Sequence, residues 1–90
     1  MNQFEEIQKY KEHFTETFKN VSRRQLSVCY KDALNTILKQ INTLENIYKF
    51  TSDFRQEFKD LAYKERQHLC LESSALYVLI RELKAGVEHD

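Results

Sequence analysis

Glycine and proline are almost missing from this chain, which has one Gly and no Pro in 90 residues. These two residues build most turns and loops. Their scarcity excludes a loop-rich fold and predicts a nearly all-helical chain with very short connections. Catalytic residues are found mostly on loops that a rigid scaffold carries, and a phosphate-binding loop needs several glycines. We therefore expect no enzyme, no catalytic residue and no cofactor-binding residue.

No charge of either sign is in excess, because 14 Lys and Arg residues balance 14 Asp and Glu residues. Proteins that bind nucleic acids usually carry a basic excess or a basic stripe. The densest basic spot here is the pair Arg23 and Arg24. The charge pattern argues against a nucleic acid as the partner, and nucleic-acid binding stays only as a third alternative.

Long apolar runs are missing too, since no segment approaches the roughly 20 successive apolar residues of a membrane span. The N-terminal segment is charged and amphipathic, so we expect no signal peptide there. Cys29 and Cys70 then indicate free thiols in a reducing compartment. We predict a cytoplasmic protein that does not bind a membrane.

What the chain does contain is helical periodicity, and it is clearest between Tyr30 and Tyr48. Apolar side chains recur there in steps of four and three, which places them on one face of a helix and is typical of bundles and coiled coils. The residues of this face are Tyr30, Leu34, Ile37, Ile41, Leu44 and Tyr48. The pattern predicts a long helix that packs along one apolar stripe.

Start and stop signals predict helices over about residues 2–19, 23–49 and 53–85. Ser22 and Gln25 form a capping box that starts the second helix after a tight turn, so we expect the first two helices to be antiparallel neighbours. Gly86 is expected to end the third helix. The predicted fold is an all-α antiparallel three-helix bundle in a single domain over residues 1–90. A break near residues 72–74 is the four-helix alternative.

The unequal helix lengths leave one end of the bundle uncovered. At 1.5 Å per residue the helices measure roughly 27, 40 and 50 Å, so the first helix covers the second only to about residue 40. Beyond it, the second and third helices form a two-helix tip over about residues 41–62. Monomers rarely expose large contiguous apolar patches. Either the aromatic residues of the tip fold over one another, or the tip binds a partner.

We expect partner binding at the tip, by helix-against-helix packing of apolar side chains with a charged rim. The run at residues 75–80 supplies a second set, because six successive apolar residues surround a helix on all sides. The expected partner-binding residues are Ile41, Leu44, Tyr48, Phe50, Phe54, Phe58 and Leu61, with Tyr77 and Val78 as the second set.

A metal site is weighed and set aside. The expected helix register puts His13, Cys29, His68 and Cys70 at similar heights, and a tetrahedral zinc site needs four such ligands. However, His68 and Cys70 are two residues apart, so they point to different sides of a helix. Since the spacing lacks a paired zinc motif, we expect no metal ligand. A Cys29–Cys70 disulfide is the other alternative.

The sequence thus predicts a non-enzymatic protein–protein interaction module, a small subunit or adaptor of a helical assembly, or a homodimer. The alternative is a small regulatory or immunity-type protein that binds and inhibits another macromolecule. The salt dependence of binding distinguishes both of these functions from nucleic-acid binding, because binding to phosphates weakens steeply as the salt concentration rises.

Overall fold

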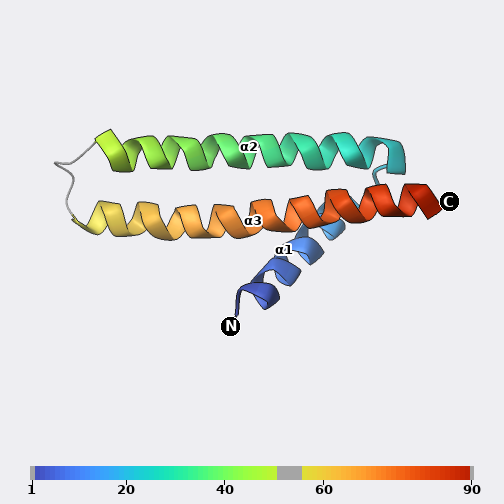
Figure 1. Cartoon of the computed structure of the whole chain (residues 1–90), viewed down its shortest axis with the longest axis horizontal. Coiled ribbons are helices and arrows are strands. Elements are labelled where there is room, and N and C mark those ends of the chain that lie inside the picture. The colour runs from blue at the N-terminus through green and yellow to red at the C-terminus, as the bar shows by residue number, and fades with distance from the viewer. Residues whose placement is uncertain (1, 51–55, 90) are drawn as a thin grey trace.

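The computed structural model describes residues 2–50 and 56–89, with all side chains in these ranges except those of Tyr48, Phe50, Phe58 and residues 87–89. Three helices follow one another: α1 (Gln3–Thr17), α2 (Arg23–Phe50) and α3 (Gln56–His89). Figure 1 shows α2 and α3 side by side and antiparallel, with α1 crossing α3 obliquely. The predicted all-α three-helix bundle with long second and third helices is confirmed.

Helix α3 runs without a break through residues 72–74, so the four-helix alternative is wrong. The two serines at this point do not interrupt the helix, because each returns its hydroxyl to a backbone carbonyl one turn earlier. The Oγ atoms of Ser73 and Ser74 both donate to the carbonyl oxygen of Cys70, at 2.7 and 2.9 Å.

The first two helices each begin directly after a polar residue, Asn2 or Ser22. The Asn2 side-chain oxygen accepts a hydrogen bond from the Glu5 backbone N–H at 2.9 Å, which satisfies one of the free amides of the first turn. Helix α2 begins directly after Ser22. The hydrogen bonds described there run from the amides of Gln25 and Leu26 to the Ser22 carbonyl, rather than to its hydroxyl.

The end of α3 differs from the prediction, because the helix passes through Gly86 and continues to His89. Among the described residues Gly86 does not take the positive φ of a helix-ending glycine. Its lack of a side chain has another consequence: a Cβ at this position would overlap the guanidinium of Arg23. Gly86 therefore leaves room for the start of α2 to approach the end of α3.

The core lies between α2 and α3 in the half of the bundle that α1 covers. Its members are mostly leucines, and Leu76 is fully buried. The buried cluster consists of Tyr30, Leu34 and Ile37 from α2 and Leu69, Leu76 and Leu79 from α3. The core therefore uses the apolar stripe that the sequence predicted for the second helix.

Helix α1 packs against α3 rather than α2, which corrects the expected order of neighbours. Phe14 and Phe18 still reach the shared core, and the rings of Phe18 and Tyr30 meet edge to face with centroids 5.7 Å apart. The bulky Tyr30 stands on the α2 side, whereas α3 presents the small, fully buried Ala75. A small residue allows two helices to approach closely, and this favours α3 as the neighbour of α1.

Candidate functional site

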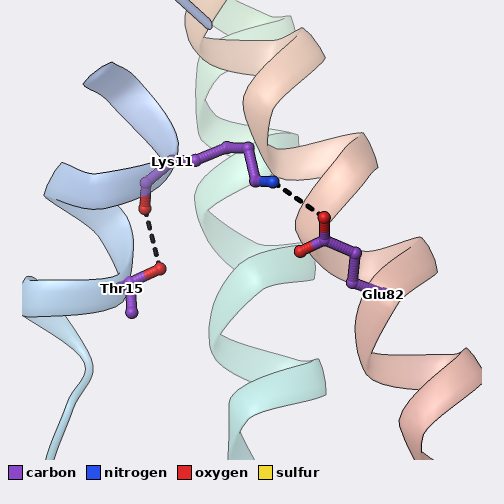
Figure 2. Close-up of polar contacts among 3 residues, drawn as sticks. All are labelled: Lys11, Thr15 and Glu82. Atoms are coloured by element: carbon purple, nitrogen blue, oxygen red, sulfur yellow. Dashed lines mark hydrogen bonds and ion pairs between the residues drawn. The ribbon is translucent and has the colours of Figure 1, made fainter. Parts of the chain in front are cut away.

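Two polar contacts fix α1 on one stripe of α3. Figure 2 shows Lys11 of α1 reaching Glu82 of α3, with Nζ and Oε1 2.7 Å apart. The phenol oxygen of Tyr10 lies 3.0 Å from Nδ1 of His68. Between these two contacts the helix repeat places residues 72, 75 and 79 on the same side of α3. We call residues 68, 72, 75, 79 and 82 the α1-facing stripe.

The α1-facing stripe carries a partly buried carboxylate, Glu72. It lines a groove of about 560 Å³ with Glu6, Lys9, Tyr10 and His13 of α1. Burial raises the pKa of Glu72, and the negative charge of Glu65 raises it further. The positive charge that His13 and His68 can carry acts in the opposite direction. The packing of α1 therefore keeps the Glu72 carboxyl group partly away from water, and this disfavours its charged form.

Tyr10 experiences the same surroundings. Burial raises the pKa of its phenol, followed by the negative charges of Glu72, Glu6 and Glu65. The phenol therefore stays neutral at pH 7 and can donate its proton. In the histidine tautomer with the proton on Nε2, Nδ1 of His68 accepts this hydrogen bond.

The same stripe continues beyond α1 toward the tip, the α2–α3 end formed by residues 41–50 and 56–62. Leu61 and Glu65 precede His68 by seven and three residues, so they extend the line of the α1-facing stripe. Figure 1 shows the first turns of α1 pointing away from the hairpin, which leaves the tip with two helices only among the described residues. Leu61 is 64% exposed there.

We call this uncovered face of the hairpin the open side. It contains a groove of about 440 Å³ between the two long helices, with leucines in its floor and polar groups around them. The lining residues are Thr36, Lys39, Gln40, Thr43 and Leu44 of α2, and Glu65 and Leu69 of α3. Ile47 follows Thr43 by four residues on the same side of α2 and is 43% exposed.

The opposite face of the tip is closed by an ion pair. Arg66 donates from Nε and Nη2 to the same carboxylate oxygen of Glu45, at 3.0 and 2.8 Å. These hydrogen bonds raise the pKa of Arg66. Leu44, Glu45, Lys49, Ala62, Tyr63 and Arg66 line a groove of about 390 Å³ on this face. Two of its three charged groups, Glu45 and Arg66, are already paired with each other, which makes it the less favourable binding face.

The expected partner-binding residues divide into three groups. Ile41 and Leu44 are half-buried and pack against the core, and Leu44 also lines the groove of the open side. Leu61 and Tyr77 are exposed, at 64% and 52%, while Val78 is half-buried. Phe54 and the side chains of Tyr48, Phe50 and Phe58 lie outside the described residues.

Ile47 is an exposed tip residue that the sequence prediction did not include among the partner-binding residues. The prediction chose the residues of the apolar stripe, and Ile47 lies off that stripe. Its neighbours at helical spacing are the polar residues Thr36, Gln40 and Thr43. The available sequence signal was that Ile47, an apolar residue, continues a line of polar residues at helical spacing.

The expected register of the histidines and cysteines does not assemble a ligand set. Cys29 and Cys70 are both free thiols and both half-buried. His68 is instead bonded to Tyr10. Over residues 2–50 and 56–89 no three His, Cys, Asp or Glu side chains are grouped as a metal site would require.

Within the same ranges, none of the three helices combines the length and the apolar character of a membrane span. Comparisons of the chain with protein-family models, with curated proteins and with solved structures found no match.

Proposed function

We propose that this chain is a non-enzymatic protein–protein interaction module, a small helical subunit or adaptor that binds through the open side of its tip. One observation carries the proposal: Leu61 and Ile47 are exposed on the face that α1 leaves uncovered. Because Glu45 faces Arg66 in the hairpin, Ile47 is level with residue 64. It therefore lies about one helical turn from the level of Leu61.

The energetics favour a partner at this position. Burying a leucine or isoleucine that water would otherwise contact contributes roughly 1.5–3 kcal/mol. The free energy of unfolding of a small domain is only about 5–15 kcal/mol, so the contribution of burying two such side chains is large in comparison. The exposed Glu57, Lys64 and Glu65 lie about one helical turn from Leu61, and Lys39 lines the groove farther along, so charged groups form a rim around the apolar residues. An apolar centre inside a polar rim is the usual anatomy of a protein interface.

A partner helix is the occupant that the shape of the open side fits. Two neighbouring helices with a groove between them can accept a third helix, and the open side has such a groove between α2 and α3. The two half-buried free thiols support an intracellular setting for this interaction, because free cysteines persist in reducing compartments.

Site-directed photo-crosslinking in cells tests the proposal. A photo-reactive amino acid in place of Leu61 should give discrete protein adducts, whether to a second copy or to another protein. Ile47→Glu in the same chain should remove these adducts. The control places the photo-reactive amino acid at Val28, which is 58% exposed near the start of α2. Equal adduct formation from positions 61 and 28 would disprove a binding surface at the tip.

A further inference from the structure

The fold separates charges that are interleaved in the sequence. Six acidic side chains and three lysines line the grooves on the side of the hairpin that α1 and the open side share. The six acids are Glu6, Glu12, Glu16, Glu65, Glu72 and Glu82. The opposite side of the hairpin, which we call the rear face, contains the groove at Arg66. The balance of charges over the whole chain therefore does not describe the charge of either side.

Two lines of side chains at helical spacing form the rear face. On α3 the line starts at Tyr63 and Arg66 and continues in steps of three, four and seven through residues 70 and 77 to residues 81 and 84. On α2 the line runs from Glu45 back through residues 38 and 31 to residue 24, in steps of seven that keep side chains on one side of a packed helix. Because Glu45 faces Arg66, Lys31 is level with residue 80 and Arg24 with residue 87.

Four cationic side chains meet at the end of the rear face that is far from the tip. They are Arg24, Lys31, Arg81 and Lys84, and all four are exposed. Their levels span seven residues, which is about 10 Å along the hairpin. Among the described residues none of the four takes part in an ion pair. Like charges this close repel one another, so an anionic partner stabilises them.

Acidic side chains near this cluster do not neutralise it. Asp32 and Glu82 lie on the lines of residues 36 and 79, which line the grooves on the other side of the hairpin, and Glu82 is bound to Lys11 there. Glu88 follows Lys84 by four residues, and its side chain lies outside the described residues. Even with Glu88 counted, four cations face one acid.

The other acids of the rear face lie at its tip end and already have partners. Glu45 is paired with Arg66. Asp60, at the edge of the face, accepts a hydrogen bond from the side chain of Gln56 at 3.0 Å. The cluster around residue 81 is therefore the place on the rear face where cations are most concentrated.

An exposed aromatic ring lies beside these cations. Tyr77 precedes Arg81 by one turn of α3 and is 52% exposed. The exposed Asn35 of α2 is level with residue 76, so its amide lies on the same part of the hairpin. The combination recurs toward the tip, where Lys49 and Tyr63, which is 54% exposed, line the groove of the rear face. Surfaces that bind single-stranded nucleic acids have this composition, because phosphates pair with the cations and unpaired bases stack on the rings.

Two other occupants fit this face less well. A second copy of the chain would place cations against cations across the interface, which costs free energy. An anionic membrane surface also attracts cations, but helices that lie on membranes insert a continuous face of bulky apolar side chains. On the rear face the exposed apolar residues Val28 and Leu38 are separated along α2 by the amide of Asn35.

We propose that the rear face binds single-stranded nucleic acid, with phosphates on Arg24, Lys31, Arg81 and Lys84 and a base stacked on Tyr77. The inference goes beyond the proposed function, because it concerns the opposite face of the hairpin and a different class of partner. The charge count of the sequence disfavoured this class of partner, because a count does not show which charges share a face.

Fluorescence anisotropy with the whole chain and labelled oligothymidylate or oligouridylate tests this proposal for DNA and RNA. Strands of about 20 nucleotides suffice, since surfaces of this kind cover roughly 4–16 nucleotides. Four phosphate contacts on a single strand predict a slope of about −2.8 for log K against log salt concentration. Raising the salt from about 50 to 200 mM should therefore weaken binding about 50-fold.

Each part of the site has its own variant. Lys31→Gln and Arg81→Gln should each reduce the salt slope by about 0.7, because one phosphate contact is lost. Tyr77→Ala should weaken binding at least about fivefold without changing the slope, whereas Tyr77→Phe should bind like the wild type, because stacking needs the ring and not the hydroxyl. Lys64→Gln, at an exposed lysine beside the open side, is the charge-matched control and should leave binding unchanged.

Four results would overturn the proposal. Absence of binding at about 50 mM salt, where phosphate contacts are strongest, excludes the site. An equal loss from Lys64→Gln and Arg81→Gln shows that the strand does not prefer the rear face. If poly-glutamate competes as well as the strands and Tyr77→Ala binds normally, the face binds acidic proteins instead. If vesicles of phosphatidylserine and phosphatidylcholine bind and the strands do not, the partner is a membrane. Circular dichroism of each variant checks that the helices remain, and all substituted residues are exposed.

Discussion

The phenol oxygen of Tyr10 lies 3.0 Å from Nδ1 of His68 and forms one of the two polar contacts described above between α1 and α3. These residues are 58 positions apart in the chain. Tyr10 lies between the exposed start of α1, where Phe4 is 77% exposed, and its packed end, where Phe14 and Phe18 contact the core.

Tyr10→Phe should loosen α1 while leaving the α2–α3 pair intact. The substitution removes one solvent-accessible hydrogen bond, so we expect a loss of about 0.5–1 kcal/mol in the free energy of unfolding. His68→Ala should add little to this loss, because both changes remove the same contact. Amide hydrogen exchange should become faster in α1 and stay unchanged around Leu34. Additive losses in the double variant would show that the two side chains are not coupled.

Glu72→Gln should stabilise the protein at neutral pH. The folded state raises the pKa of Glu72 above its ordinary value of 4.5, because burial and the charge of Glu65 disfavour the carboxylate. A raised pKa means that the contribution to stability is complete below about pH 4.5 and is lost as the pH rises through the raised value. The gain at pH 7 should be below about 1 kcal/mol, since water screens a partly exposed group.

Thermal unfolding of Glu72→Gln and the wild type between pH 4 and pH 8 measures this effect. The two melting temperatures should agree near pH 4 and separate toward pH 8, with the variant higher. Glu12→Gln, an exposed position on α1, serves as the charge-matched control. A variant that is less stable than the wild type at pH 7 would contradict the assigned cause.

Leu76→Ala should be the most damaging single truncation of the core. Leu76 is fully buried between α2 and α3, and removing such a side chain leaves a cavity. We expect a loss of roughly 2–5 kcal/mol, measured by urea denaturation. The neighbouring Tyr77→Ala should cost much less, because Tyr77 is 52% exposed. Similar losses for the two variants would mean that Tyr77 is covered in solution, which would support it as a second contact surface.

Gly86→Ala should stabilise α3 slightly, although a Cβ would overlap the Arg23 guanidinium. The guanidinium is the far end of a flexible side chain and can move aside. Alanine is preferred to glycine inside a helix by up to about 1 kcal/mol, and the position near the helix end reduces this gain. Urea denaturation should show a gain of a few tenths of a kcal/mol. A loss of stability would indicate that the position of the Arg23 guanidinium against Gly86 contributes to the packing of α2 on α3.

The helices could be predicted because their signals are local. The stripe from Tyr30 to Leu44 is readable at a spacing of three and four, and Tyr30, Leu34 and Ile37 are indeed core residues. The start of α2 after Ser22 was equally readable. The end of α3 was not, because a glycine signals a helix end only if the chain turns there, and at Gly86 it does not.

Which helix α1 would cover, and which tip residues would remain exposed, depended on packing between distant segments. Ile41 and Leu44 look like Leu61 in the sequence, yet the first two turn toward the core and the third toward water. The sequence by itself determined three helices of unequal length, through the near-absence of glycine and proline and the repeat of apolar residues. Only the tertiary structure decided that α1 lies on α3 and leaves the hairpin before the tip, because contacts such as Tyr10–His68 and Lys11–Glu82 join residues far apart in the chain.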